Sequence, residues 1–238
     1  NGAAPAFATA FAALKSLREV RMPQNGIRPE GIVKLVTGLA GNSKLAVLDL
    51  QDNTFTLSGS EALASALPKW DALEHLNVGD CLLGSKGGRL VIEALKDCPT
   101  LKVVNLQYNE IEQDGAAALA ESLRTLKLLE SLELNGNRFD AESNAVDLIK
   151  AALSENDIDD DIIGSLSDME EITDDEEEEE EEESESEHSE EEKEKEEKEE
   201  KTNANAMNED STRPKTASET LEDDLADLVS QMKKQLNV

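Results

Sequence analysis

Residues 129–139 read L-E-S-L-E-L-N-G-N-R-F, and this stretch shows the unit from which the chain is built. Leucines stand at its first, fourth and sixth positions, an asparagine at its ninth and an apolar residue at its eleventh. With a few similar residues substituted, the same pattern begins at four earlier positions, each 28 residues apart: Leu17, Leu45, Leu73 and Leu101. No insertion or deletion separates the five copies. One structural unit is therefore repeated along the chain.

Each copy predicts a strand followed by a helix. In the second copy, Leu48 and Leu50 alternate with Asp49, which predicts a strand with its leucines in the core and the aspartate outside. About fifteen residues of helical pattern follow each strand. In residues 115–123, for example, alanines and leucines gather on one face. A unit of this length is the long type of leucine-rich repeat, as in ribonuclease inhibitor.

The predicted fold is α/β, a leucine-rich repeat solenoid shaped as a horseshoe, with a parallel sheet on its concave face and helices on its convex face. Residues 1–153 form this domain, with five full repeats and a polar C-terminal cap at about residues 141–153. The run A-P-A-F-A-T-A-F-A-A-L at residues 4–14 predicts the helix of a partial N-terminal repeat. We therefore expect the chain to be a C-terminal fragment, with further repeats upstream.

The ninth position of the pattern forms a row, which we call the asparagine ladder: Asn25, Asn53, Cys81, Asn109 and Asn137. A side-chain amide there can satisfy backbone groups of the turn that leaves the strand, so we interpret these residues as structural. Cys81 takes the place of an asparagine, and no cluster of histidines and cysteines surrounds it that would predict a metal site.

A second row lies near the start of each predicted helix: Gly31, Gly59, Gly87 and Gly115, with Ser143 in the last copy. Residues this small are expected to let each helix lie close to its strand.

The charge divides the chain in two. Residues 1–153 carry 19 acidic and 15 basic side chains, whereas residues 154–238 carry 35 and 8. Residues 154–215 predict a mostly disordered acidic tail, which either attracts a basic partner or only keeps the chain soluble. Residues 216–238 predict an amphipathic helix, which either docks on a partner or on the repeat domain, or forms only transiently.

The residues that usually carry chemistry are missing from the sequence. It contains no phosphate-binding glycine-rich loop, no metal-ligand spacing and no nucleophile triad signature. Aromatic residues make up 3% of the chain and no basic patch is present, which argues against nucleic acid as a partner. No apolar stretch has transmembrane length, which argues against a membrane. The sequence thus favours a binding solenoid without cofactor or metal over an enzyme, and its two cysteines favour a reducing compartment.

Several longer strings resemble the C-terminal repeats of the family of Ran GTPase-activating proteins. They are Q-N-G-I-R-P-E-G-I (24–32), V-L-D-L-Q-D-N-T-F-T (47–56), D-C-L-L (80–83), L-Q-Y-N-E-I-E (106–112) and L-E-L-N-G-N-R-F (132–139). The acidic stretch that follows the repeats resembles the acidic tail of that family. The similarity covers roughly residues 10–195.

The resemblance implies that the protein activates GTP hydrolysis by the small GTPase Ran during transport between nucleus and cytoplasm. Its partner would be Ran in its GTP form, with a Ran-binding protein as a candidate second partner, and its location cytoplasmic, with a perinuclear position as an option. Such an activator orients the glutamine and the attacking water of the GTPase itself. In this family the residues nearest the nucleotide belong to earlier repeats. The chain is thus expected to hold no catalytic residue and to supply part of the Ran-docking surface.

Within the matching strings, residues in the loops that leave the strands are the predicted partner contacts: Gln24, Arg28, Gln51, Asp52, Asp80, Gln107 and Tyr108. Tyr108, the single tyrosine, either anchors a partner or packs on the neighbouring loop. Arg28 either reaches an acidic partner or caps its own turn.

Two other readings stay open. One is an acidic leucine-rich repeat protein that binds basic nuclear proteins such as histones, although proteins of that kind have shorter repeats and lack these strings. The other is a ribonuclease inhibitor, a family rich in cysteine, against which the two cysteines of this chain count.

Overall fold

The computed structural model of the protein describes residues 2–169, and in this range short strands alternate with helices. The strands are β1 (Glu19–Arg21), β2 (Val47–Asp49), β3 (His75–Asn77), β4 (Val103–Asn105) and β5 (Ser131–Glu133). The helices are α1 (Ala4–Ala13), α2 (Pro29–Leu39), α3 (Thr56–Ala66), α4 (Gly84–Leu95), α5 (Gln113–Leu123) and α6 (Asn144–Glu155), with 3₁₀ turns η1 (Leu67–Lys69) and η2 (Asp160–Ile162).

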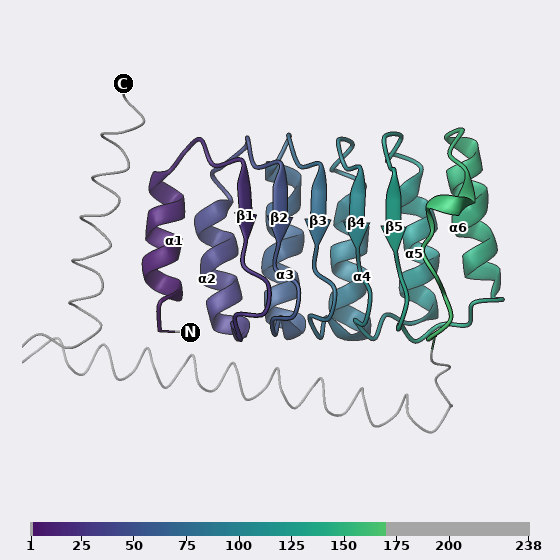
Figure 1. Cartoon of the computed structure of the whole chain (residues 1–238), viewed down its shortest axis with the longest axis horizontal. Helices are drawn as coiled ribbons and strands as arrows, with labels where there is room; N and C mark the ends of the chain where they lie inside the picture. Colours follow the sequence, from purple (N-terminus) through teal and green to yellow (C-terminus); the bar gives the residue numbers. More distant parts are fainter. Residues whose placement is uncertain (1, 170–238) are drawn as a thin grey trace, which may run out of the picture. The chain divides into compact units, whose positions relative to one another are not determined.

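The five strands form one parallel sheet in the order of the sequence. Every neighbouring pair has the same register, so that Val20 pairs with Leu48, Leu48 with Leu76, and each following strand continues the row. Figure 1 shows the strands side by side on one face and the helices behind them. The predicted leucine-rich repeat solenoid is confirmed, because the repeat spacing of the sequence is also the register of the sheet.

The core lies between the sheet and the helices, where the leucines of the pattern are buried. Leu48 and Leu50 have no exposed surface, and Leu132 and Leu134 are 0% and 2% exposed. The helices add their own apolar faces, for example Leu119 and Leu123 of α5. Burying one such side chain stabilises the fold by about 1.5–3 kcal/mol before entropy is subtracted, and stacking supplies that burial to every repeat.

The glycines near the helix starts have a different role from the one predicted. A Cβ atom on Gly87 of α4 would lie 2.6 Å from Oγ of Ser60 on α3, and one on Gly59 would lie 3.2 Å from Cγ2 of Ile32 on α2. The nearest neighbours of these positions therefore include the preceding helix and not the strand. The small residues let successive helices pack closely against one another.

The folded unit extends past the predicted boundary at residue 153. α6 begins at Asn144, preceded by a turn at residues 141–143, and it ends at Glu155. The chain then passes through η2 and reaches residue 169, and five apolar side chains of this segment pack against the core: Ile158, Ile162, Ile163, Leu166 and Met169. Most of the acidic tail and the predicted helix at 216–238 lie outside the described residues. Within residues 2–169 no helix is long and apolar enough to cross a membrane.

Candidate partner-binding surface

Four of the predicted contact residues share an unusual backbone conformation. Gln24, Asp52, Asp80 and Tyr108 have φ angles of 56°, 55°, 54° and 52°, and the fifth repeat has Gly136 at 69°. Residues other than glycine pay roughly 1–2 kcal/mol for this left-handed conformation, so it persists only where other contacts hold it. We call this row, Gln24, Asp52, Asp80, Tyr108 and Gly136, the strand-exit rim.

Hydrogen bonds between repeats hold the rim. The N–H of Gln24 donates to the carbonyl oxygen of Gln51 at 2.9 Å, and that of Asp80 donates to the carbonyl oxygen of Gln107 at 2.8 Å. The N–H groups of the other two non-glycine members bond in the same way to the next repeat. Because parallel strands lie about 4.8 Å apart, the rim displays its side chains as an evenly spaced row along one edge of the sheet.

The side chains of the rim differ in exposure. Gln24 and Asp80 are exposed, Asp52 is half-buried, and 46% of the surface of Tyr108 is exposed. Arg28 is also exposed and lies directly before α2, where its carbonyl oxygen accepts bonds from the first turn of the helix. The structure thus brings the rim residues into one row, with Arg28 in the loop beyond it.

The remaining two predicted contacts, Gln51 and Gln107, lie beside the rim and are half-buried. Nδ2 of Asn77 donates to Oε1 of Gln51 at 3.1 Å, and Nε2 of Gln107 donates to Oε2 of Glu133 at 2.9 Å. Both glutamine side chains are therefore already engaged within the sheet face, and a partner would meet them as parts of a network.

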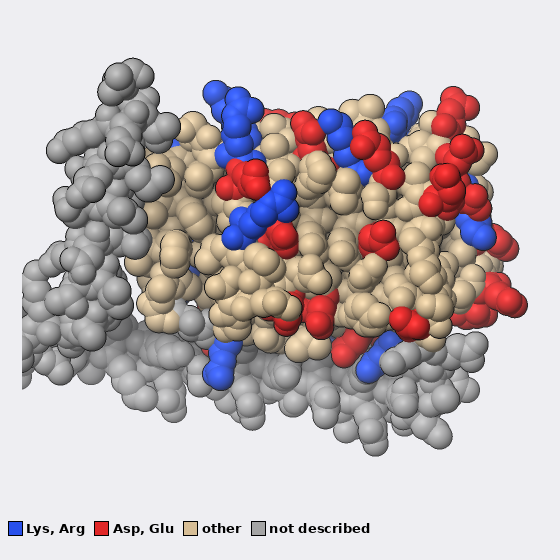
Figure 2. Space-filling view, viewed as in Figure 1, with Lys and Arg blue, Asp and Glu red and all other residues tan. Residues whose placement is uncertain are grey.

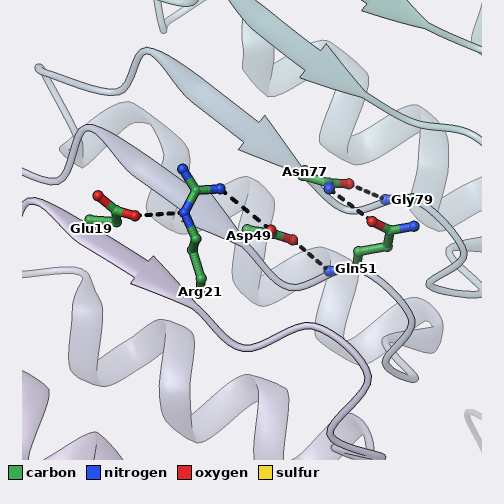
Figure 3. A network of polar contacts seen from close by, with 6 residues as sticks. All are labelled: Glu19, Arg21, Asp49, Gln51, Asn77 and Gly79. Carbon is green, nitrogen blue, oxygen red and sulfur yellow. Dashed lines mark hydrogen bonds and ion pairs between the residues drawn. The ribbon is translucent and has the colours of Figure 1, made fainter.

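Figure 3 shows that network at the first three strands. Nε of Arg21 lies 2.6 Å from Oε1 of Glu19, and Nη1 of Arg21 lies 3.6 Å from Oδ2 of Asp49. The hydrogen bond that Arg21 donates to Glu19 is the main reason why the pKa of Arg21 is raised. Oδ1 of Asp49 then accepts the N–H of Gln51 at 3.3 Å. The sheet face is thus cross-linked from one repeat to the next before any partner arrives.

A row of turn-forming side chains in these strands was not predicted from the sequence. Oδ1 of Asn77 accepts the N–H of Gly79 at 3.1 Å, and Oδ1 of Asn105 accepts the N–H of Gln107 at 3.0 Å. With Asp49 these residues are spaced by 28 and each bonds the N–H two positions later, which fixes the turn into the rim. An acid or amide recurring at the repeat spacing was the signal that would have revealed them.

The asparagine ladder lies directly behind the rim. Asn109 is fully buried; its Oδ1 accepts the N–H of Cys81 at 3.0 Å, and its Nδ2 donates to the carbonyl oxygen of Val78 at 2.8 Å. Asn53 and Asn137 make equivalent bonds to the repeat before them. These amides therefore tie the exit turn of each repeat to that of the preceding one.

Two ladder members differ from the rest. Asn25 is exposed, and its Nδ2 donates to the carbonyl oxygen of Pro23 at 2.8 Å. Cys81 is buried, and its Sγ donates to the carbonyl oxygen of Leu50 at 3.3 Å, so the thiol reproduces only the donor half of an amide. Burial raises the pKa of the Cys81 thiol to about 12, which keeps it protonated and unreactive at neutral pH.

A second ladder at the opposite edge of the sheet was not predicted. Three side chains of different types occupy the same position of successive repeats. Each donates to a carbonyl oxygen 31 residues earlier, near the C-terminal end of the helix of the preceding repeat. They are Asn42 to Phe11 at 2.9 Å, Trp70 to Leu39 at 3.1 Å, and Cys98 to Leu67 at 3.4 Å. These carbonyl groups at the helix C-termini also accept a backbone N–H of their own turn, so each side chain adds a bond that joins two successive repeats.

Charges of both signs lie over the sheet face, as Figure 2 shows, while acidic side chains gather at the end of the array near α6. Among residues 2–169 no group of three histidine, cysteine, aspartate or glutamate side chains is arranged to hold a metal ion. What the described surface offers is a cross-linked sheet face bordered by a row of loop side chains, a geometry suited to contact with another protein.

Comparison with known proteins agrees with this architecture. A family model described as "Leucine Rich repeat" matches residues 41–64 and 97–120. The actin-binding site 2 domain of leiomodin-1 has the same fold, with a TM-score of 0.52 at 19% identity over 63% of this chain and 87% of that one. Over 144 residues, 58% of this chain, the sequence is 42% identical to Ran GTPase-activating protein 1 of Saccharomyces cerevisiae. The predicted resemblance to the Ran GTPase-activating proteins is confirmed.

The similarity reaches a second Ran GTPase-activating protein. RAN GTPase-activating protein 2 of Arabidopsis thaliana is 30% identical over 100 residues, which are 42% of this chain and 18% of that protein. Pig ribonuclease inhibitor is also 30% identical, over 129 residues, as expected for a shared repeat type. The chain spans about a third (35%) of the length of the yeast Ran GTPase-activating protein.

Proposed function

We propose that the protein takes part in stimulating GTP hydrolysis by Ran, and that the repeats of this chain supply part of the surface on which Ran in its GTP form docks. The observation that carries the proposal is the 42% identity to the yeast Ran GTPase-activating protein over 144 residues, well above the 30% identity to pig ribonuclease inhibitor. A cytoplasmic location and a role in transport between nucleus and cytoplasm are part of the same proposal.

The docking surface that we propose is the strand-exit rim together with Arg28, Gln51 and Gln107. The backbone of the rim is held by bonds between repeats before a partner binds, which lowers the entropy cost of association. Asp52 and Asp80 bring two carboxylates to neighbouring repeats at the same register. Carboxylates in such a row favour a basic surface on the partner and speed its approach.

The proposed role is regulatory. Activators of this kind orient groups of the GTPase rather than forming covalent bonds, so docking geometry is what the activator contributes. On this proposal the chain binds Ran·GTP but, without the earlier repeats of the family, accelerates hydrolysis weakly.

Two measurements test the proposal. The first is equilibrium binding of the chain to Ran loaded with a non-hydrolysable GTP analogue and, as control, to Ran·GDP; binding should favour the GTP form by about tenfold or more. The second is single-turnover GTP hydrolysis by Ran with this chain or with the yeast relative. Absence of binding to either form, or equal binding to both, refutes the docking role. Hydrolysis as fast as with the yeast relative refutes the proposal that this chain binds Ran·GTP but accelerates hydrolysis only weakly.

A further inference from the structure

The segment after α6 returns to the sheet and ends against the rim. Ile163 forms a parallel bridge with Leu132 of β5, and the N–H of Gly164 donates to the carbonyl oxygen of Leu132 at 3.0 Å. A Cβ atom on Gly164 would collide with the carboxylate of Glu133, so the Glu133 side chain would have to shift to admit a larger residue here. We call residues 163–168 the edge segment, because they lie along the outer edge of β5.

Asp168, at the end of the edge segment, joins two loops that are distant in the sequence. Its N–H donates to Oδ1 of Asn135 at 2.9 Å, while its Oδ2 accepts Nδ2 of Asn135 at 2.8 Å. The same Oδ2 accepts the hydroxyl of Tyr108 at 3.1 Å. Asp168 thus hydrogen-bonds to the loop of the fifth repeat through both its backbone and its side chain. It also accepts a hydrogen bond from the tyrosine of the fourth repeat.

Tyr108 is fixed at both ends of its ring. Its backbone is held in the rim by the bond to the carbonyl oxygen of Asn135, at 2.9 Å. The ring packs directly over Gly136, where a Cβ atom would collide with it. The hydroxyl is then held by Asp168, yet 46% of the residue's surface remains exposed. A large aromatic side chain that is both exposed and immobilised is suited to serve as an anchor in an interface.

The surroundings of the ring are acidic. Asp168 raises the pKa of Tyr108, first through the hydrogen bond and then through its charge, and Asp80 adds a smaller contribution in the same direction. Two carboxylates therefore lie near an exposed aromatic face. A lysine or arginine side chain that stacks on that face would meet the ring quadrupole and both negative charges.

We propose that Asp168 is a positioning residue, which holds the Tyr108 ring as an anchor for a basic side chain of the docked GTPase. The edge segment, which follows the last repeat, is then part of the docking surface. This inference rests on the proposed function and assigns a role to residues that lie outside the repeat pattern.

The contact can be tested without any partner. Because Tyr108 is the single tyrosine, ultraviolet absorbance of the phenolate reports its titration directly. In the wild-type chain the tyrosine pKa should exceed the ordinary value of about 10, and Asp168→Ala should lower it. Asp161→Ala is the matched control: it removes an exposed carboxylate whose side chain makes no hydrogen bond or ion pair with the described residues, and it should leave the titration unchanged. An unchanged titration in Asp168→Ala refutes the contact and the inference with it.

The role in docking is tested by a double-mutant cycle on binding to Ran carrying the GTP analogue. Tyr108→Phe keeps the ring but loses its tether, so Tyr108→Phe and Asp168→Ala should each weaken binding about three- to tenfold, and the double variant should be no weaker than either. Asp168→Asn removes the charge but still accepts the hydroxyl, so it should weaken binding less than Asp168→Ala does. Asp161→Ala should stay within about twofold of wild type.

The outcomes separate the two proposals. If the wild-type chain binds Ran·GTP and Asp168→Ala binds equally or more tightly, or if the two losses add in the double variant, the positioning role is wrong and the proposed function stands. If Asp168→Asn is as weak as Asp168→Ala, charge rather than positioning accounts for the effect, and the inference also fails. If the wild-type chain does not bind Ran·GTP, the proposed function is refuted and the docking role of Asp168 with it.

Discussion

Nδ2 of Asn137 donates to the carbonyl oxygen of Leu106 at 3.0 Å, which joins the exit turn of the fifth repeat to the residue that follows β4 in the fourth. Oδ1 of the same side chain accepts the N–H groups of Asn109 and Ile111, each at 3.1 Å. A buried amide with all these bonds leaves several backbone groups without partners when it is removed.

Replacing this amide should therefore be costly. Asn137→Ala should lower the free energy of unfolding by about 2–4 kcal/mol, because buried backbone donors and a carbonyl lose their bonds. Urea denaturation followed by circular dichroism measures the change. Asn25→Ala at the same register is the matched control, since Asn25 is exposed, and it should cost less than about 0.5 kcal/mol. Equal losses at the two positions would contradict the account of the ladder.

Trp70 tests the second ladder. Its Nε1 donates to the carbonyl oxygen of Leu39, the last residue of α2, at 3.1 Å, and the ring is 1% exposed. Trp70→Phe removes this donor together with part of the ring, so unfolding should become easier by about 1–3 kcal/mol. Thermal and urea denaturation by circular dichroism are suitable, because the variant lacks the single tryptophan. A variant as stable as wild type would mean that the bond to Leu39 contributes nothing.

Two glycines, Gly136 in the rim and Gly26 in the loop that follows it in the first repeat, distinguish backbone strain from steric crowding. Gly26 and Gly136 both have positive φ, 56° and 69°, but a Cβ atom on Gly26 would meet nothing within 4 Å, whereas one on Gly136 would collide with the Tyr108 ring. Gly26→Ala should cost about 1 kcal/mol of stability from conformation alone. Gly136→Ala should cost more than Gly26→Ala by at least about 1 kcal/mol and should also displace the tyrosine, visible as a changed tyrosine titration. Equal costs, with the titration unchanged, would show that the ring does not pack there.

The cysteines give a prediction about pH. Burial raises the pKa of Cys81 and of Cys98 to about 12 each. A thiol with a raised pKa favours the protonated form in the folded state, so this contribution to stability is present below the ordinary thiol pKa and is lost as pH rises toward 12. At pH 8 both thiols should react with a thiol reagent only after denaturant is added. Rapid modification of the folded chain at that pH would contradict their burial.

The periodic parts of the structure could be predicted from the sequence, because units that recur at a constant spacing stack on one another with a constant register. The leucine pattern predicts the strands, the constant register of the sheet and the buried row from Val20 to Leu132. Residues 4–14 predicted α1, which the structure has at Ala4–Ala13. The asparagine pattern likewise pointed to the buried amides behind the rim.

The parts that escaped prediction depend on contacts that no period encodes. Asn42, Trp70 and Cys98 occupy the same position of successive repeats, and each donates a hydrogen bond to the preceding repeat. Their residue types differ, so the sequence pattern does not show what they have in common. The hydrogen bond between Tyr108 and Asp168 joins residues 60 positions apart, and Asp168 lies outside the repeats. No local sequence pattern therefore predicts this bond. For Tyr108 the predicted packing on the neighbouring loop is confirmed, because the ring lies against Gly136 while 46% of the residue's surface stays exposed; its role as a partner anchor stays a prediction.

Docking of Ran·GTP on the strand-exit rim can be tested by reversing one charge within the rim. Asp80 is exposed on the rim, and Glu61 is exposed on α3. Equilibrium titration of Ran carrying a non-hydrolysable GTP analogue, with circular dichroism to verify folding, compares the wild-type chain with Asp80→Lys and Glu61→Lys. We expect Asp80→Lys to weaken binding by about tenfold or more and Glu61→Lys to stay within about twofold of wild type. Equal affinity of all three chains, or an equal loss in both variants, would contradict docking on the rim.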